Sequence, residues 1–532
     1  MPGSVIFHLY AGTLLHWLRR RYQSYFRSSC SVLTQLHSQA AQPLRHVRES
    51  FQDSSSSCFC LSSLQLLGCQ QSDMAKQRPC MIDVTVLSGQ SVSVLVGQGE
   101  KVGELRKSAQ KKFRRGISHL VHLDGGLLDD TLTVEDAGLC DGDLVMGTFG
   151  RASIVSSRRS VAFAVIRGDG SVVTWGDYSS GGDSRMAQEE LRGVREVCAS
   201  GDAFAALRED GRVVTWGRGP GSSLDSAVQA QLTNVTSICA TATAFAAVRA
   251  DGSVVTWGAS NAGGDSRWVQ PQLCDVHAVY ASESAFAAVR RDGSVVTWGN
   301  SSSGGDSKPV QKLLLNVADI SATDTAFAAI LQSGHVVTWG CAAQGGDSSH
   351  VRQRLEHVQA ISSTADAFAA LRTDGTVVTW GGALCGGESS DVQRDLRQVR
   401  QVCGSTNAFA ALRMDGSVVC WGGNGPFVQA HGVERLHASA VAFAALMSDS
   451  NVFTWGDPLY GGGSASPDLK DVQQIAASAS AFAALHVDGT VTAWGHPHGG
   501  GHIRPGAQRH LLDVFRTDQP PIDPEEDQEY WL

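Results

Sequence analysis

The feature that most constrains this chain is a sequence repeat. The stretch AFAAVRRDGSVVTWG at residues 285–299 recurs in near copies at 203–217, 244–258 and 367–381. The repeat is marked by nine tryptophans: Trp175, Trp216, Trp257, Trp298, Trp339, Trp380, Trp421, Trp455 and Trp494. The first seven are 41 residues apart, the last two intervals are 34 and 39 residues, and a phenylalanine stands twelve residues before each tryptophan. Such a fixed period indicates an architecture in which each copy is one structural unit.

Each unit predicts a small antiparallel sheet. Two β-prone runs flank an Asp-Gly pair such as Asp251-Gly252, which favours a hairpin closed by a tight type I′ turn. A third strand precedes the hairpin, with apolar residues three apart, as at Val194 and Val197. A three-stranded sheet cannot bury both of its faces, so neighbouring units must stack, and radial stacking gives a β-propeller. We expect a mainly β chain whose propeller covers residues 152–517. Nine blades, or seven regular blades with two divergent units, both remain open.

The ends of the repeat suggest how the ring closes. The first unit has Ser153 and Ser156 where the third strand should carry apolar residues. After the last tryptophan, Leu511–Thr517 (LLDVFRT) looks like a spare copy of that strand. The sequence therefore predicts that a C-terminal strand completes the first blade.

These units resemble the regulator-of-chromosome-condensation repeat family, whose hallmark is a hydrophobic hairpin, a DG turn and a terminal W-G. They are shorter than typical members and similar to the compact repeats of bacterial β-lactamase inhibitory proteins in that superfamily. The resemblance covers roughly two thirds of the chain. It implies a protein-binding platform, since some members exchange nucleotide on small GTPases and others lie inside HECT-type ubiquitin ligases. The strict 41-residue spacing leaves no room for a long exchange wedge between the first seven blades.

A second recurrence lies in the loops between the units. The motif Gly-Gly-Asp/Glu-Ser places an acidic residue at Asp183, Asp265, Asp306, Asp347 and Glu388. In a ring these side chains would form an acidic circle for a basic partner or a cation. The alternative, which we favour, is turn chemistry, because Gly supplies positive φ and Asp and Ser bond the local backbone. Likewise, we favour packing between blades over a ligand-stacking ring as the role of the tryptophans.

Residues 80–149 have a different pattern. Ile82, Val84 and Val86 alternate with polar residues, and a turn leads into a second alternating run at 92–96. A helical stretch follows, with Val102, Leu105, Ala109 and Phe113 at helical spacing. Then come HLVHLDGGLLDD (119–130) and DGDLVM (141–146). This order strongly resembles the ubiquitin-like β-grasp fold, so we expect an N-terminal β-grasp domain.

The resemblance implies a candidate docking patch on this domain. The family's three apolar docking positions correspond to Leu87, His122 and Thr148, and only Leu87 keeps the usual residue. A docking surface and an ordinary solvent-facing surface are equally compatible with this pattern. Conjugating members end in a free Gly-Gly, whereas here Gly150-Arg151 runs on into the repeats, which argues against conjugation.

The two ends of the chain fit neither domain. Residues 1–79 hold an apolar stretch, Val5–Leu18, that ends at three arginines and is too short for a membrane span. The first 73 residues are rich in Arg and Ser and poor in acids, which fits an organellar targeting segment; the alternative is that translation starts at Met74. The tail 518–532 is acidic and predicts a solvated end.

Composition narrows the function classes. The net charge of −9 and the absence of a long basic run argue against nucleic acid as a partner. The 13 cysteines are scattered without a CxxC pair, which favours reduced thiols in the cytoplasm or nucleus over disulfides or zinc. No nucleophile elbow, P-loop, HExxH motif or dinucleotide fingerprint is present, so we expect no enzyme, cofactor or metal site and no membrane partner. The oligomeric state stays undetermined.

The leading hypothesis is a non-enzymatic adaptor that binds proteins, with the ubiquitin-like domain docking to ubiquitin–proteasome components. Two alternatives stay open. The chain could be a nucleotide-exchange or chromatin-associated regulator of a small GTPase, or it could be part of an E3 ubiquitin ligase.

Overall fold

The computed structural model describes residues 79–150, 152–423, 430–463, 469–517 and 522. The predictions for residues 1–78 and for most of the acidic tail lie outside this part of the chain. The described residues fall in one compact unit, in which the four-stranded sheet and the repeats are joined.

The first domain is a four-stranded sheet with one helix. Its elements are β1 (Pro79–Val86), β2 (Ser91–Gly97), α3 (Val102–Phe113), β3 (Ile117–His122) and β4 (Leu144–Phe149). The strand order is β2-β1-β4-β3, with β1 and β4 parallel and the other neighbours antiparallel. The alternating residues Ile82, Val84 and Val94 and the helical residues Val102 and Leu105 meet in one buried core. This is the predicted β-grasp arrangement.

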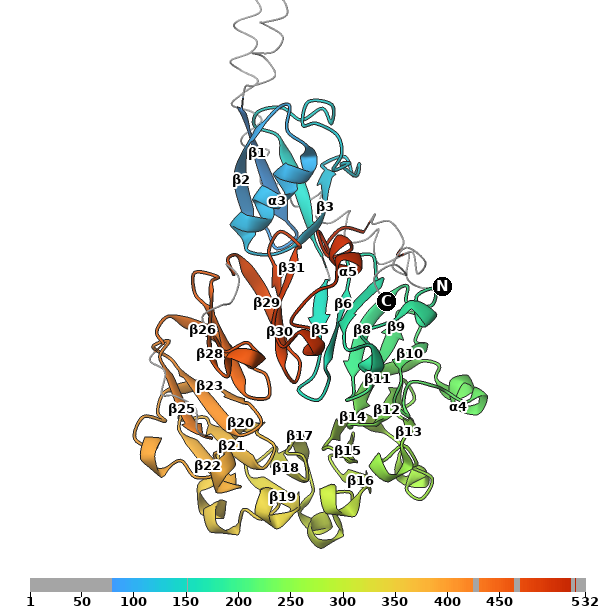
Figure 1. Cartoon of the computed structure of the whole chain (residues 1–532), viewed down its shortest axis with the longest axis vertical. Helices are drawn as coiled ribbons and strands as arrows, with labels where there is room; N and C mark the ends of the chain where they lie inside the picture. Colours follow the sequence, from blue (N-terminus) through green and yellow to red (C-terminus); the bar gives the residue numbers. More distant parts are fainter. Residues whose placement is uncertain (1–78, 151, 424–429, 464–468, 518–521, 523–532) are drawn as a thin grey trace, which may run out of the picture. The chain divides into compact units, whose positions relative to one another are not determined.

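The rest of the described chain holds nine three-stranded antiparallel sheets, which form a ring of blades numbered 1 to 9 in chain order (Figure 1). The first strand of each blade lies nearest the centre and is called inner: β5 (Ser153–Val155), β8 (Val194–Ala199), β11 (Val235–Ala240), β14 (Val276–Ala281), β17 (Val317–Ala322), β20 (Val358–Ser363), β23 (Val399–Gly404), β26 (Val433–Ala438) and β29 (Val472–Ala477). The middle strands are β6 (Ala162–Ile166), β9 (Ala203–Arg208), β12 (Ala244–Arg249), β15 (Ala285–Arg290), β18 (Ala326–Leu331), β21 (Ala367–Arg372), β24 (Ala408–Arg413), β27 (Ala442–Met447) and β30 (Ala481–His486). The outer strands are β7 (Val172–Gly176), β10 (Val213–Gly217), β13 (Val254–Gly258), β16 (Val295–Gly299), β19 (Val336–Gly340), β22 (Val377–Gly381), β25 (Val418–Gly422), β28 (Val452–Gly456) and β31 (Val491–Gly495).

Short helices fill the loops that lead from one blade to the next. They are η1 (Tyr178–Ser180), η2 (Arg185–Ala187), α4 (Ser226–Gln231), η3 (Ser260–Ala262), η4 (Gln270–Gln272), η5 (Ser301–Ser303), η6 (Lys308–Leu313), η7 (Ala342–Gln344), η8 (Ser349–Arg354), η9 (Ala383–Cys385), η10 (Ser390–Val392), η11 (Pro458–Tyr460), η12 (Pro497–Gly499) and α5 (Pro505–Arg509).

Two local details differ from the predicted unit. The DG hairpin is one residue longer than a type I′ turn: in blade 3, Gly252 N–H donates to the Arg249 carbonyl and only Gly252 has positive φ. This is the turn-plus-bulge connection, in which a single left-handed residue suffices. The inner strands also carry a β-bulge, between Val194 and Glu196 in blade 2. The bulge explains why apolar residues three apart share one face.

The predicted C-terminal segment lies where the ring closes, but it does not form the predicted strand. Blade 1 has its own inner strand, β5, which pairs with β6, and residues 511–517 form no strand. Leu511 and Val514 nevertheless lie fully buried in the core between blades 9 and 1, beside Ile154 of β5. Both ends of the repeat region therefore contribute to the first blade. The β5 strand pairs with β6, and the C-terminal segment adds buried apolar side chains to the core. With this closure, the described ring has nine blades.

The β-grasp domain is fixed to the ring by a buried polar cluster. Arg106 on α3 is 1% exposed, and its guanidinium lies 2.7 Å from a carboxylate oxygen of Asp130 and 2.5 Å from one of Asp513. The Gln110 amide donates to the Val487 carbonyl at 2.6 Å. Phe515 is fully buried and lies so close to Gly116 that an added Cβ would come within 2.3 Å of its ring.

Candidate protein-binding site

The repeated tryptophans lock each blade to the one before it. Each indole stacks on the phenylalanine of its own hairpin, with ring centroids 5.1–5.3 Å apart in every blade. In eight of the described blades the indole N–H donates to a glycine carbonyl in the preceding loop: Trp175 to Gly500, Trp216 to Gly181, Trp257 to Gly221, Trp298 to Gly263, Trp339 to Gly304, Trp380 to Gly345, Trp421 to Gly386 and Trp494 to Gly461. Because all nine side chains are at most 6% exposed, their main role is packing between the blades, and they form no open ring on which a ligand could stack.

The five acidic loop residues lie at equivalent positions and make the same local contact. Each carboxylate accepts a hydrogen bond from the backbone N–H two residues ahead: Asp183 from Arg185, Asp265 from Arg267, Asp306 from Lys308, Asp347 from Ser349 and Glu388 from Ser390. Asp183 and Asp265 also pair with the guanidinium of the same arginines, at 3.0 and 2.6 Å. These contacts are the predicted turn chemistry, while a role in partner binding stays a prediction.

Beside two of these loops, large hydrophobic side chains point into solvent. Met186 and Trp268 each stand two residues after the serine of the motif, and they are 100% and 92% exposed. The matching positions in blades 4, 5 and 6 hold Pro309, His350 and Asp391. The sequence contained a signal for Trp268, because it is the one tryptophan within residues 152–517 that falls outside the repeat spacing.

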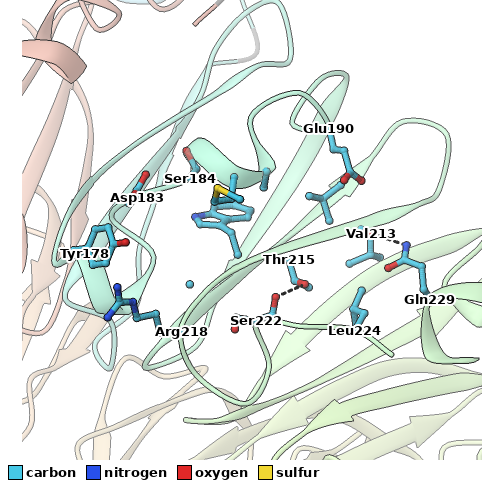
Figure 2. Close-up of a pocket in the computed structure, with 15 residues that line it drawn as sticks. Tyr178, Asp183, Ser184, Glu190, Val213, Thr215, Arg218, Ser222, Leu224 and Gln229 are labelled. Carbon is cyan, nitrogen blue, oxygen red and sulfur yellow. Dashed lines mark hydrogen bonds between the residues drawn. The ribbon is translucent and has the colours of Figure 1, made fainter. Parts of the chain in front are cut away.

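Met186 borders a pocket of about 350 Å³ between blades 1 and 2 (Figure 2). The guanidinium of Arg218 lies 4.3 Å from the ring centroid of Tyr178, a cation–π contact at the mouth. Leu224 and the buried Val213 contribute apolar surface, and Asp183, Glu190 and Gln229 contribute polar groups. Figure 2 shows the Thr215 hydroxyl bonded to the Ser222 carbonyl, at 2.9 Å, below this mouth. Polar groups make up the larger part of this lining and apolar groups the smaller part, so a partner side chain that enters the pocket would need hydrogen-bonding groups as well as apolar surface.

Trp268 borders an equivalent pocket of about 510 Å³ between blades 3 and 4. Val269 and Trp298 form part of its wall, and Lys308 and Gln311 provide hydrogen-bond donors. The same loop position therefore presents a hydrophobic side chain next to a pocket at two places on the ring, after blade 1 and after blade 3. We define Met186, Trp268 and these two pockets as the rim site.

The centre of the ring is joined by a belt of backbone hydrogen bonds. At eight of the nine junctions in the described ring, one N–H at the turn from the inner to the middle strand donates to the carbonyl of the matching residue in the next blade, at 2.8–3.0 Å. Each residue of this series donates its N–H to the carbonyl of the next one: Gly201, Ala242, Glu283, Asp324, Ala365, Thr406, Ala440, Ala479 and Ser160. Across this belt, Arg158 and Arg159 of blade 1 reach Asp324 of blade 5, at 3.1 and 3.0 Å. Burial and the charge of Arg159 lower the pKa of Arg158, and Asp324 opposes them.

The predicted patch of the β-grasp domain is brought together only in part. Val86 lies opposite Gly147 in the parallel pair β1–β4, which places Leu87 next to Thr148 on the sheet face that points away from α3. Leu87 is 80% exposed, while the Thr148 hydroxyl bonds to Ser118. His122 pairs with the core residue Val145, so strand alternation turns it toward the other face, where it contacts Asp124 at 3.3 Å. Met81, Leu95 and Leu144 are also exposed, but the strand register places them toward the opposite end of β1 from Leu87.

Comparison with known proteins gives matches among solved structures only. No family model matches the chain, and no curated protein does. Yeast RCC1 (Prp20) bound to Kap60 is 16% identical, with a TM-score of 0.33 over 57% of this chain and 78% of that one. Human WBSCR16 is also 16% identical, with a TM-score of 0.33 over 50% and 87%. The CRINKLY WD40 ectodomain of the Arabidopsis thaliana receptor kinase ACR4 is 14% identical, with a TM-score of 0.32 over 49% and 95%.

Because these TM-scores are far below 0.5, the strand pairing of this chain, and not the overlays, defines its class. It is a nine-bladed propeller of short repeats that carries a β-grasp domain. Within its described part, the chain contains no helix long and apolar enough to cross a membrane. The cysteines of the same part are free thiols.

Proposed function

We propose that this chain is a non-enzymatic scaffold that binds other proteins through the rim of its propeller. The observation that supports this most directly is the exposure of Met186 and Trp268 beside two equivalent pockets. A fully exposed tryptophan has an unfavourable contact with water that burial against a partner removes, by about 25 cal/mol per Å² of apolar surface. Aromatic and methionine side chains are also those that interfaces favour.

The fixed ring is suited to this role. Both side chains stand on short loops whose turns are held by Asp183 and Asp265, and each neighbouring blade is locked by a buried tryptophan. A partner that binds such a surface loses little free energy in ordering it. Repetition also argues against catalysis, because the repeated residues are engaged in packing and turns.

The β-grasp domain is the second proposed contact surface. We propose that it is ubiquitin-like and links the scaffold to ubiquitin–proteasome components, in which case the chain would serve as an accessory part of a ligase. Its exposed face around Leu87 points away from the helix that anchors it to the ring through Arg106. Binding at that face would therefore leave the anchor undisturbed.

Affinity capture from the source cells tests the proposal with point variants of the full chain. Deleting the β-grasp domain is a poor test, because it would uncover the buried Phe515. We compare the wild type with Met186→Ser plus Trp268→Ser, and separately with Leu87→Glu. Met414→Ser is the matched control, since Met414 is 67% exposed but stands at the DG turn of blade 7.

Loss of specific proteins with the double variant, and not with the control, would support the rim site. Loss of ubiquitin–proteasome components with Leu87→Glu would support the second surface. Identical partners in all four samples would refute both surfaces. A small GTPase among the rim-dependent partners would favour the exchange-factor alternative, which a nucleotide-release assay would then decide.

A further inference from the structure

The loop after blade 9 departs from the acidic pattern of the other loops. After blades 1, 3, 4, 5 and 6 the residue that follows the Gly-Gly pair is acidic, whereas after blade 9 it is His502. The same loop also carries His496, His498 and Arg504, and no acidic residue occurs from residue 489 to residue 512. Basic groups therefore replace acidic ones at this part of the rim.

Three of these side chains line a pocket of about 350 Å³ between blades 9 and 1. His498, His502 and Arg504 come from the loop after blade 9, and Asp177 and Tyr178 come from the loop after blade 1. Both histidines are exposed, and Arg504 is half-buried. An imidazole can donate a hydrogen bond in either protonation state, and a guanidinium donates several. The pocket therefore offers donors that suit carboxylate groups.

The acidic group of this pocket is engaged in its own turn. The Asp177 carboxylate accepts hydrogen bonds from the Ser179 N–H, at 2.9 Å, and from the Ser179 hydroxyl. Arg504 stands at the loop position of Arg185 and Arg267, which each pair with the aspartate of their own loop. Since a histidine takes the place of that aspartate after blade 9, the ion pair that neutralises the equivalent arginines cannot form within this loop.

The acidic segment of the chain begins beside this pocket. Ile522 is half-buried and packs on the buried core between blades 9 and 1, which includes Ile503. In the sequence, Ile503 lies between His502 and Arg504 of the pocket. Since seven residues of extended chain span roughly 23 Å, the side chains of residues 523–529 are within reach of the pocket. This segment holds five acidic residues: Asp523, Glu525, Glu526, Asp527 and Glu529.

We propose that the pocket between blades 9 and 1 binds an acidic segment, and that its occupant is the chain's own segment 523–529. Carboxylates of this segment would accept hydrogen bonds from His498, His502 and Arg504. Because the segment is tethered at Ile522, its effective concentration at the pocket is high, on the order of millimolar, so weak individual contacts suffice to hold it.

A docked segment would lie next to the rim site, because Tyr178 borders both this pocket and the pocket beside Met186. Composition alone predicts a solvated tail, and the basic pocket beside Ile522 is the feature that favours a docked one. The inference goes beyond the proposed scaffold function and does not depend on it, because it concerns a contact within one chain.

The test measures binding of a fluorophore-labelled peptide with the sequence of residues 522–532 to the full chain by fluorescence anisotropy. A neutral-tail variant of the full chain carries five amide substitutions: Asp523→Asn, Glu525→Gln, Glu526→Gln, Asp527→Asn and Glu529→Gln. We expect saturable binding to this variant and at least tenfold weaker apparent binding to the wild type, whose own tail occupies the pocket. A peptide with the same five changes should bind the neutral-tail variant at least tenfold more weakly.

Substitutions in the pocket provide the second arm. In the neutral-tail variant, His502→Asp plus Arg504→Ser should weaken peptide binding at least tenfold. Blade 5 has the same two residues at these positions, Asp347 and Ser349, so the loop should tolerate them. Arg267→Ser is the matched control, because Arg267 has the same loop position after blade 3 and its side chain is 86% exposed. It should leave binding unchanged, and thermal unfolding shows whether each variant is folded.

Three results would overturn the proposal. The first is a lack of saturable binding to the neutral-tail variant, and the second is equally tight binding to the wild type. The third is unchanged binding after His502→Asp plus Arg504→Ser, since the peptide would then bind elsewhere. None of these measurements needs a cellular partner, so this proposal and the proposed rim site can fail independently.

Discussion

The indole N–H of Trp175 donates a 2.9 Å hydrogen bond to the carbonyl of Gly500, 325 residues away in the sequence. This bond joins blade 1 to the loop after blade 9, and it repeats the contact that Trp298 makes with Gly263 inside the ring. The closing junction is therefore built from the same parts as the internal junctions.

Replacing Trp175 by phenylalanine tests whether the closing junction is as strong as an internal one. The variant loses the bond, leaves the Gly500 carbonyl unpaired in a buried site and opens a cavity, which together should cost about 2–4 kcal/mol. Trp298→Phe is the matched control and should cost a similar amount. Urea unfolding measures both. A full effect at Trp298 with none at Trp175 would mean that the ring does not close through this contact.

Two substitutions in the loop after blade 4 distinguish a role in turn formation from a role in an acidic binding circle. Gly304 has a φ of +89°, and a Cβ there would lie 2.5 Å from the ring of Phe327. Gly304→Ala should therefore destabilise the fold by more than about 2 kcal/mol, since the left-handed region alone costs about 1–2 kcal/mol. Asp306→Asn keeps an oxygen acceptor and should be almost neutral. Thermal unfolding compares the two; a larger loss with Asp306→Asn would show that the negative charge itself matters.

The DG turns predict a loss of stability in acid. Hydrogen bonds from the next serine or threonine lower the pKa of Asp251, Asp292, Asp374 and Asp415. A folded-state pKa below the unfolded value of about 3.9 adds stability above that value, and this stability disappears as the pH falls through the lower folded pKa. The melting temperature should therefore drop below about pH 4.

A variant with all four aspartates changed to asparagine is the control for this pH dependence. Asparagine retains the acceptor oxygen but does not titrate, so the decline in melting temperature between about pH 4 and pH 2 should become shallower. Scanning calorimetry at several pH values makes the measurement. An unchanged decline would assign the acid sensitivity to other groups.

The anchor between α3 and the C-terminal segment should be sensitive to single changes. Arg106→Met leaves Asp130 and Asp513 as neighbouring carboxylates in a poorly solvated site, which should cost about 3–5 kcal/mol, because breaking a buried pair strands a charge. Adding Asp513→Leu to that variant should recover part of the loss. Limited proteolysis near residues 150–152 and urea unfolding measure both the loss of stability and its recovery. Full stability of Arg106→Met would show that the pair does not hold the domain.

The periodic residues made most of the fold predictable from sequence. Phe286 and Trp298 recur with their spacing because they meet the same neighbours in each blade, and the predicted strands formed around them. The inner-strand bulge and the longer DG turn were missed because each adds one residue without changing the period. Leu511 and Val514 were predicted to belong to a spare third strand for the first blade; they are buried at the closure of the ring, but they form no strand because β5 already pairs with β6.

The candidate sites were harder to predict, because their residues are the ones that depart from the repeat. Met186 and Trp268 fill a loop position that holds proline, histidine or aspartate elsewhere, so the repeat gave no signal for Met186, and Trp268 stood out only as a tryptophan outside the repeat spacing. The contact of Arg158 and Arg159 with Asp324 spans the ring and depends on its diameter. His122 corresponds to a docking position by order, but pairing with Val145 turned it to the other face of its sheet.

The belt at the centre of the ring has an evolutionary consequence. Each described link uses only a main-chain N–H and a main-chain carbonyl, so residues as different as Gly201, Glu283 and Thr406 make the same bond. Apart from Gly201, where an added Cβ would lie 2.9 Å from the Ala242 carbonyl oxygen, substitutions at these positions can therefore change the charge and shape of the hub without removing the bonds between blades. A lineage could diversify this face freely, acquiring new specificities on a frame whose assembly does not depend on them.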